Sequence, residues 1–308
     1  RYKLKPTACQ HKILSEILDS QCQLYNVGLE QRIAAYKICK KTLSYYTQCK
    51  ELTTLRKESE YSNVPAQLQR GTLARLDEAF KGFFRRVKAG TKAGFPRFKG
   101  RGWFNSFSFA EFSGIQLIGK KLYFKGLPGG LRVSMHRPLP IRQDGKLAGK
   151  ILCCQLKRTF KGWYVCLQIK IDCTEEHSGE AVGIDVGLIN LATLSTGEVI
   201  PNQCFAEENA TQLRKAQRAF SRCKLGSKRR KKVRINVIRI HQKIMNSRHT
   251  YLHQQSAELT KRFSIIALEK LNINNMLKGK LAKPIYHTGW STFKQMLIYK
   301  ALKAGGEV

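Results

Sequence analysis

Two carboxylates stand out because each lies at the end of a short apolar segment. In Gly183-Ile-Asp-Val-Gly187, Val182 and Ile184 alternate with small residues around Asp185, a period of two that predicts a buried strand. An unpaired carboxylate is costly to bury, so Asp185 needs a cation or a hydrogen-bond donor. We expect the flanking glycines to clear space for a metal ion or a phosphate. A purely structural Asp185, bonded to a neighbouring backbone or side chain, is the alternative.

The second carboxylate is Glu269. The segment Ser264-Ile-Ile-Ala-Leu-Glu-Lys-Leu271 is apolar and short, which predicts a core strand that ends on Glu269. A further strand, at 191–194, follows Asp185 at the spacing of a hairpin. Two carboxylates in neighbouring strands bind Mg²⁺ and align water against a phosphodiester. The pair therefore predicts a metal-dependent site for phosphate chemistry.

The charge of the chain indicates the class of partner. Among 308 residues, 56 are Lys or Arg and only 21 are Asp or Glu, a net charge of +35. Such an excess repels itself unless a polyanion neutralises it, which favours nucleic acid. A membrane surface is the alternative, but we find no run of apolar residues long enough to span a bilayer and no cleavable signal. The cysteines are scattered without a Cys-x-x-Cys pair, as in a reduced intracellular protein.

One basic segment interleaves cations with aromatic rings. Residues 81–101 hold eight Lys or Arg and no acidic residue. Within them, the segment Phe95-Pro-Arg-Phe-Lys99 predicts that Phe95, Arg97 and Lys99 track a nucleic-acid backbone and stack on bases. A solvated loop with two buried anchors is the alternative.

A second basic segment is a predicted helical hairpin over residues 205–262. Its apolar positions recur at helical spacing on both sides of a basic turn, and fourteen Lys or Arg lie between Arg214 and Arg248 with no Asp or Glu. A charge run this one-sided predicts binding to a polyanion. The candidate contacts are Arg214, Arg218 and Arg222 on the first helix, and Lys228, Arg229, Arg230, Lys231 and Lys232 at the turn. A nuclear-localisation signal is a weaker interpretation of this last cluster.

Periodicity divides the chain into three parts. Residues 1–6 and 91–175 read as strands of a small antiparallel barrel, and residues 7–90 read as helices inserted into it. A polar linker at 172–180 leads to the third part, residues 176–308. Tyr45, Tyr46 and Gln69 in the helical part face either solvent or a base edge. We include Tyr45 and Gln69, with Phe107 of the predicted strands, among the candidate nucleic-acid contacts.

Four motifs in order along the chain resemble TnpB, the OrfB-type protein of bacterial insertion sequences, which is related to type V CRISPR effector nucleases. They are Gly94-Phe-Pro-Arg-Phe-Lys99, Gly183-Ile-Asp-Val-Gly187 with Ala192-Thr-Leu-Ser-Thr-Gly197, the basic hairpin, and Leu268-Glu-Lys-Leu-Asn272. The resemblance implies a multi-domain α+β protein: an antiparallel β-barrel (WED) domain, an inserted helical recognition domain, and a RuvC nuclease domain of RNase H fold.

The resemblance also implies a function. We expect an RNA-guided DNA endonuclease encoded by an insertion sequence, acting as a monomer within a ribonucleoprotein in a bacterial or archaeal cytoplasm, at the nucleoid. It would bind a transposon-end guide RNA and cleave double-stranded target DNA beside a short flanking motif. Asp185 and Glu269 would be the first two RuvC carboxylates, holding Mg²⁺ in a two-metal site.

The sequence departs from the family at its C-terminal end. The family carries a third carboxylate after a four-cysteine zinc site, whereas here the one acidic residue after Glu269 is Glu307, and no Cys follows Cys223. We expect the third carboxylate and the zinc site in a segment beyond Val308, with residues 306–308 beginning the next strand. As written, these residues alone should cleave poorly or not at all.

Two other functions compete with this interpretation. A guide-RNA-directed DNA-binding protein, similar to a repressor, would keep the binding and lose the cleavage, as a missing third carboxylate would favour. An ATPase of the actin and sugar-kinase type also has Gly-Ile-Asp-x-Gly before a hairpin. Such proteins are less basic, and the sequence has no second Asp-x-Gly-Gly loop downstream.

Overall fold

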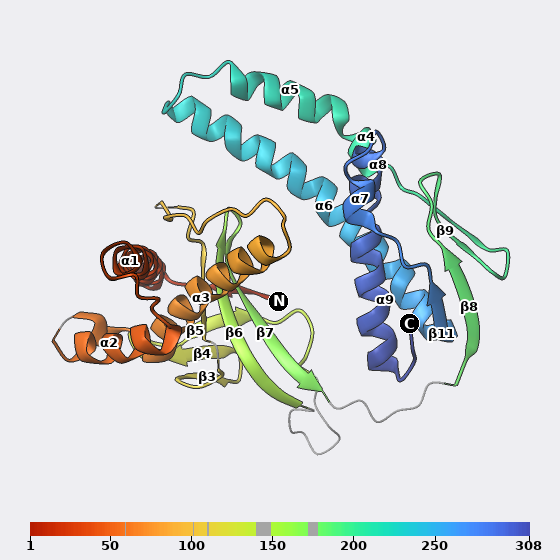
Figure 1. Ribbon diagram of the computed structural model, residues 1–308. Helices are drawn as coiled ribbons and strands as arrows, with labels where there is room; N and C mark the ends of the chain where they lie inside the picture. Colours follow the sequence, from red (N-terminus) through yellow and green to blue (C-terminus); the bar gives the residue numbers. More distant parts are fainter. Residues whose placement is uncertain (59, 101, 110, 140–148, 172–177) are drawn as a thin grey trace. The chain divides into compact units, whose positions relative to one another are not determined.

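The computed structural model describes residues 1–58, 60–100, 102–109, 111–139, 149–171 and 178–308. The chain forms two compact units, Arg1–Asp172 and Cys173–Val308 (Figure 1). Each unit is described by itself. Within the described residues, no helix is both long and apolar enough to cross a bilayer.

The first unit is built on a seven-stranded antiparallel sheet with the order β2-β6-β7-β1-β5-β4-β3. Its strands are β1 (Tyr2–Lys5), β2 (Ser106–Phe109), β3 (Ile115–Ile118), β4 (Lys121–Phe124), β5 (Leu131–Ser134), β6 (Gly149–Thr159) and β7 (Gly162–Ile171). Phe109 in the edge strand β2 packs against Phe124 in β4, near the opposite edge, with ring centroids 5.5 Å apart. This contact shows that the sheet curls into a nearly closed barrel. The N-terminal strand is a member, paired with β5 and β7 as predicted.

Helices lie between β1 and β2 in the chain and pack on the barrel. They are α1 (Ala8–Cys39), α2 (Tyr45–Glu58), the 3₁₀ turn η1 (Glu60–Asn63) and α3 (Ala66–Lys88). Thr7 and Gln10 form a reciprocal capping box that starts α1. Leu14 and Leu18 of α1 and Leu68 of α3 belong to the same buried core as the barrel strands. The helices and the barrel therefore share one core.

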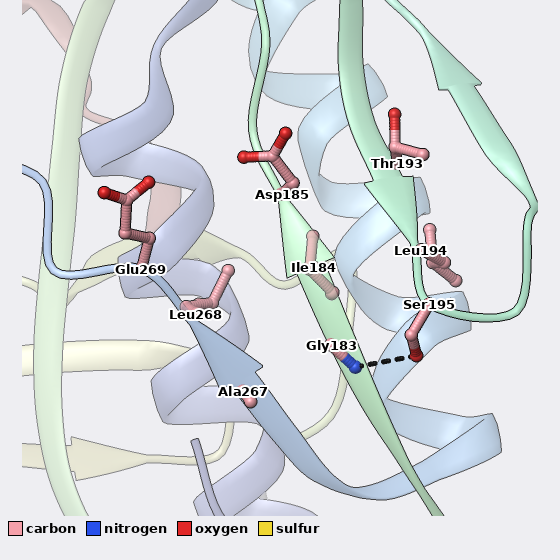
Figure 2. A pocket seen from close by; sticks show the side chains of 9 residues that line it. All are labelled: Gly183, Ile184, Asp185, Thr193, Leu194, Ser195, Ala267, Leu268 and Glu269. Carbon is pink, nitrogen blue, oxygen red and sulfur yellow. Dashed lines mark hydrogen bonds between the residues drawn. The ribbon is translucent and has the colours of Figure 1, made fainter.

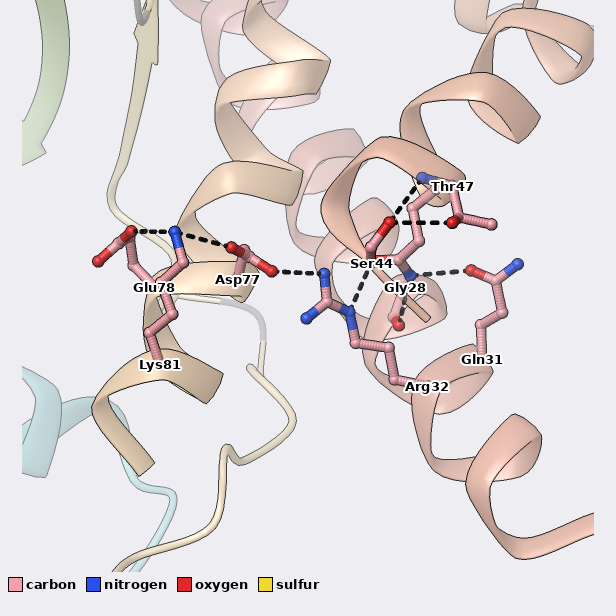
Figure 3. A network of polar contacts seen from close by, with 9 residues as sticks. Gly28, Gln31, Arg32, Ser44, Thr47, Asp77, Glu78 and Lys81 are labelled. Atoms are coloured by element: carbon pink, nitrogen blue, oxygen red, sulfur yellow. Dashed lines mark hydrogen bonds and ion pairs between the residues drawn. The ribbon is translucent and has the colours of Figure 1, made fainter. Parts of the chain in front are cut away.

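A polar network joins the three helices to one another (Figure 3). The guanidinium of Arg32 in α1 donates to Gln48 Oε1 of α2 at 2.8 Å and to Asp77 Oδ1 of α3 at 3.0 Å. Lys81 pairs with Asp77 on its other oxygen at 3.1 Å, and Gln48 donates to the Gly28 carbonyl at 2.9 Å. Because Arg32 is buried, its partners satisfy a charge that would otherwise be costly to keep inside.

The second unit contains a four-stranded mixed sheet with the order β10-β9-β8-β11. The strands are β8 (Glu180–Asp185), β9 (Asn190–Leu194), β10 (Val199–Pro201) and β11 (Phe263–Leu268). Strands β8, β9 and β10 form an antiparallel meander, whereas β11 pairs with β8 in parallel. The predicted hairpin after Asp185 and the predicted strand before Glu269 are both confirmed.

Helices cover one face of this sheet. The helices of this unit are α4 (Phe205–Glu208), α5 (Ala210–Ser221), α6 (Lys228–Arg262), α7 (Ile273–Met276), α8 (Ala282–Thr288) and α9 (Trp290–Ala304), and the core of the sheet includes buried residues of α6, α8 and α9. Val182 and Ile184 pack against Leu259 of α6 and Phe293 of α9 in a buried cluster. The N-terminal half of α6 instead pairs with α5, forming a helical hairpin (Figure 1).

The C-terminal residues begin to extend the sheet. Glu307 forms a parallel bridge with Ile265 of β11, with its amide donating to the Ser264 carbonyl at 2.8 Å. The prediction that residues 306–308 start another strand is confirmed, as a single bridge.

Candidate functional site

The two predicted carboxylates meet at one edge of the mixed sheet. Asp185 is the last residue of β8, and Glu269 immediately follows β11. The parallel ladder pairs Leu268 with Ile184, so the next register position places Glu269 opposite Asp185. Neighbouring strands lie about 4.8 Å apart, and registered side chains point to the same face. In Figure 2 both carboxyl groups extend beyond the same end of their strands.

Asp185 is exposed, so the prediction of a buried carboxylate is wrong. Val182 and Ile184 face the helices, and this alternation turns Ala181 and Asp185 to the opposite face, where both are exposed. Glu269 is exposed as well. Asp185 therefore bears no cost of burial that a cation would have to offset. Both carboxylates are instead accessible to ions and to a ligand from solution.

The two flanking glycines differ in what they do. A Cβ placed on Gly187 would lie 3.0 Å from the Asn190 carbonyl oxygen, a tight contact that the turn after Asp185 would have to relieve by a few tenths of an ångström. A Cβ on Gly183 would meet nothing nearer than the Ser195 side chain at 3.6 Å, an ordinary contact. A side chain would therefore crowd the backbone at Gly187 and fit without crowding at Gly183.

An open groove of about 530 Å³ runs along the exposed face between β9 and the end of β11. Thr193 is registered with Asp185 across the β8–β9 ladder and lies on the groove beside it. Ser195 contributes differently, because its hydroxyl oxygen accepts from the Gly183 amide at 3.1 Å. The groove thus presents two carboxylates and a hydroxyl, which are all oxygen ligands.

The loop after Asp185 is held by side chains that sequence reasoning missed. The Trp290 indole N–H donates to the Gly187 carbonyl at 3.1 Å. Asn202 donates to the Leu188 carbonyl at 2.7 Å. No local sequence pattern predicts that Trp290 or Asn202 holds this loop. Both hydrogen bonds form only because α9 and the end of β10 pack beside the loop.

The donor set fits Mg²⁺, which binds proteins through one or two carboxylates together with water and substrate phosphates. Asp185 and Glu269 would hold the ion. Across the described residues, no group of three or more His, Cys, Asp or Glu lies together. Glu307 does not complete the site, because it bridges Ile265, four residues before Glu269, which is roughly 13 Å along the strand.

The side chains of three candidate nucleic-acid contacts in the first unit are buried or half-buried. Gln69 is 0% exposed and bonds to Arg56 and to the Tyr61 carbonyl. Phe107 is 3% exposed, in the barrel core. Tyr45 is half-buried, and burial, followed by a hydrogen bond between its hydroxyl and the Cys49 side chain, raises its pKa to about 12. Gln69 and Phe107 are therefore packing residues, and the predictions that they contact bases are wrong.

The basic hairpin presents most of its cations to solvent. Arg214, Arg218 and Arg222 are exposed and spaced by four along α5. Residues 228–232 form the first turns of α6, after the Ser227 N-cap, rather than the turn between the helices. Four of these five are exposed. The exception is Arg230, which donates to the Phe220 and Cys223 carbonyls at 3.0 and 2.8 Å.

The fold and the site define a two-unit α+β protein with a pair of carboxylates at one sheet edge and strongly basic surfaces. Residues 164–280 match the OrfB_IS605 family, "Probable transposase". A Streptomyces pristinaespiralis protein named "Putative RNA-guided DNA endonuclease" is 33% identical over all of this chain and 75% of its own length. The Escherichia coli K12 protein "Putative RNA-guided DNA endonuclease InsQ" is 26% identical over all of this chain and 78% of its own length.

The chain therefore belongs to the OrfB_IS605 family, which confirms the resemblance to TnpB. A solved structure agrees with this at the level of the fold. The chain in "Cryo-EM structure of the Cas12f1-sgRNA-target DNA complex" superposes with a TM-score of 0.61 over 98% of this chain and 73% of its own, at 12% identity.

Proposed function

We propose that this protein is an RNA-guided DNA endonuclease that hydrolyses phosphodiester bonds with Mg²⁺ held by Asp185 and Glu269. The observation that carries the proposal is the registered position of these two carboxylates at one edge of the sheet, on the exposed side. The names of the S. pristinaespiralis and E. coli relatives support the reaction class. The RNA and DNA in the Cas12f1 complex support the two classes of partner.

The exposed carboxylates explain why a cation is needed. Two negative side chains beside one groove repel a phosphodiester, so DNA approaches only after a cation neutralises them. Bound Mg²⁺ would supply a Lewis acid for the phosphate and lower the pKa of an attacking water. Asp185 and Glu269 would fix the ion's position. The bonds from Trp290 and Asn202 would hold the loop that follows Asp185.

The basic surfaces would hold the nucleic acids. The net charge of +35 and the cations of the hairpin suit contact with phosphates, a contribution that carries no sequence information. Sequence would instead be read by base pairing between the guide RNA and its target.

A second function, guide-directed DNA binding without cleavage, is favoured by one observation. The described residues bring two carboxylates to the site, and Glu307 lies elsewhere on the sheet. The two functions differ in one outcome: whether Mg²⁺ supports cutting of target DNA by the protein loaded with its guide.

The test is made in a full-length protein and compares Asp185→Asn and Glu269→Gln with Glu180→Gln. Each change removes one negative charge with almost no change in shape, and Glu180 is an exposed carboxylate at the opposite end of β8. We expect the first two variants to lose Mg²⁺-dependent cleavage while binding guide RNA with unchanged Kd, and the third to cleave normally. Cleavage retained by Asp185→Asn would refute the metal role. A wild-type complex that binds its target and leaves it intact would establish the second function.

A further inference from the structure

Two aromatic rings are displayed on the segment between α3 and β2. Phe98 is 56% exposed and Trp103 is 77% exposed. Rings of this size usually bury most of their surface or lie at an interface. We name residues 94–100 and 102–104 the aromatic loop.

Hydrogen bonds hold the backbone of the aromatic loop to neighbouring helices. The two rings are therefore exposed on an ordered segment. Asn26 of α1 makes two bonds with Lys99: its side-chain amide donates to the Lys99 carbonyl at 2.9 Å and accepts from the Lys99 amide at 2.8 Å. Arg86 of α3 donates to the Gly94 carbonyl at 3.1 Å. The Trp103 amide donates to the Gly100 carbonyl at 3.1 Å. The loop is thus held to α1 and α3 on both sides of Phe98.

The four aromatic rings of the loop differ in how they pack. Phe95 packs edge-on against Phe80 and Phe83 of α3, with ring centroids 5.6 and 5.3 Å apart. Phe104 is 2% exposed in the barrel core. Phe95 is 46% exposed but contacts two rings of α3, whereas Phe98 and Trp103 are the two most exposed rings of the loop.

The positive charge around these rings favours an anionic ligand. Arg97 is exposed next to Phe98, and the last turn of α3 carries Arg85, Arg86 and Lys88. No acidic residue occurs from Lys81 to Arg101. A ligand with regularly spaced negative charge and flat apolar faces is a nucleic acid with unpaired bases, because bases inside a duplex already stack on each other.

We propose that Phe98 and Trp103 stack on unpaired bases of the guide RNA; this inference rests on the proposed function. RNA is the occupant we assign, because folded RNA presents unstacked bases in its loops and bulges, and such bases stack on aromatic side chains. The sequence pattern pointed to Phe95, whereas we assign the stacking role to the more exposed rings, Phe98 and Trp103.

The test uses the fluorescence of tryptophan. Of the three tryptophans, Trp163 and Trp290 are 1% and 6% exposed, so a base that stacks on protein quenches mainly Trp103. Titrating the full chain with a single-stranded oligouridine should quench the emission. Trp103→Phe should keep the affinity and lose the quenching. Trp103→Ala and Phe98→Ala should each weaken binding by about tenfold.

Phe160→Ala is the matched control, because Phe160 is 40% exposed beside Lys161 in the same unit. Unchanged affinity in the Phe98→Ala, Trp103→Ala double variant, or an equal loss in Phe160→Ala, would overturn the inference. Stronger quenching by oligothymidine than by oligouridine would reassign the loop to a DNA strand. If these tests fail while cleavage still depends on Asp185, the stacking role of the aromatic loop is disproved and the proposed function stands. If the unsubstituted chain binds no RNA, the proposed function fails as well.

Discussion

The four exposed cations at the start of α6 provide a quantitative test of nucleic-acid binding. Lys228, Arg229, Lys231 and Lys232 are exposed, whereas Arg230 is engaged by carbonyls at the end of α5. Each cation that meets a phosphate adds about 0.7 to the slope of log K against log salt for a single strand, and about 0.9 for a duplex. Replacing all four by Gln should therefore make the slope shallower by about 3 to 4.

The assay is the Kd for guide RNA measured between about 50 and 200 mM salt, where counterion release dominates. The quadruple variant should bind more weakly at low salt, and its affinity should approach that of the unsubstituted protein as salt rises. A slope unchanged by the four substitutions would show that this cluster does not contact phosphates, and the polyanion-binding role of the start of α6 would then be refuted.

Two single substitutions separate charge from structure within the same cluster. Lys231→Gln and Arg230→Gln each remove one positive charge. Arg230→Gln also removes two hydrogen bonds to backbone carbonyls and the stacking of the guanidinium 4.0 Å from the centroid of the Phe220 ring, so it should destabilise the hairpin by about 1 to 3 kcal/mol. Thermal unfolding followed by circular dichroism should show the loss in Arg230→Gln and none in Lys231→Gln; equal melting temperatures would contradict this assignment.

Two further predictions concern packing and the site. Gly71→Ala should destabilise the first unit by about 1 to 3 kcal/mol, because the new Cβ would lie 2.5 Å from a backbone oxygen of β2. Gly82→Ala in the same helix, where the new Cβ would meet only the Arg86 side chain at 3.6 Å, should stabilise by about 0.5 to 1 kcal/mol. A denaturant titration that ranks the two variants the other way would contradict the packing. Trp290→Phe keeps an aromatic side chain, though a smaller one, and removes the bond to the Gly187 carbonyl. Cleavage should then need several-fold more Mg²⁺ while guide-RNA affinity stays the same. An unchanged Mg²⁺ requirement would show that the loop needs no such support.

The residues of the site were predictable from local patterns. A period of two around Asp185 and a short apolar run before Glu269 predict strand ends, because alternation and apolar runs depend on neighbours in the chain. The hairpin helices follow from the same kind of periodicity. The net charge of +35 predicts a polyanionic partner without any knowledge of the fold.

The three-dimensional contacts decided which of these residues act together and which are exposed. The parallel pairing of β11 with β8 joins segments separated by the meander and the long basic hairpin, and no local pattern specifies such a register. Exposure likewise depends on distant elements: α6 and α9 cover the opposite face of the sheet from Asp185, while the barrel core encloses Phe107. Sequence alone therefore determined the residue types and the local periodicity of apolar residues. Only the packing of distant segments decided that two carboxylates meet at an open edge of the sheet, and that the side chain of Trp103, rather than that of Phe107, is exposed.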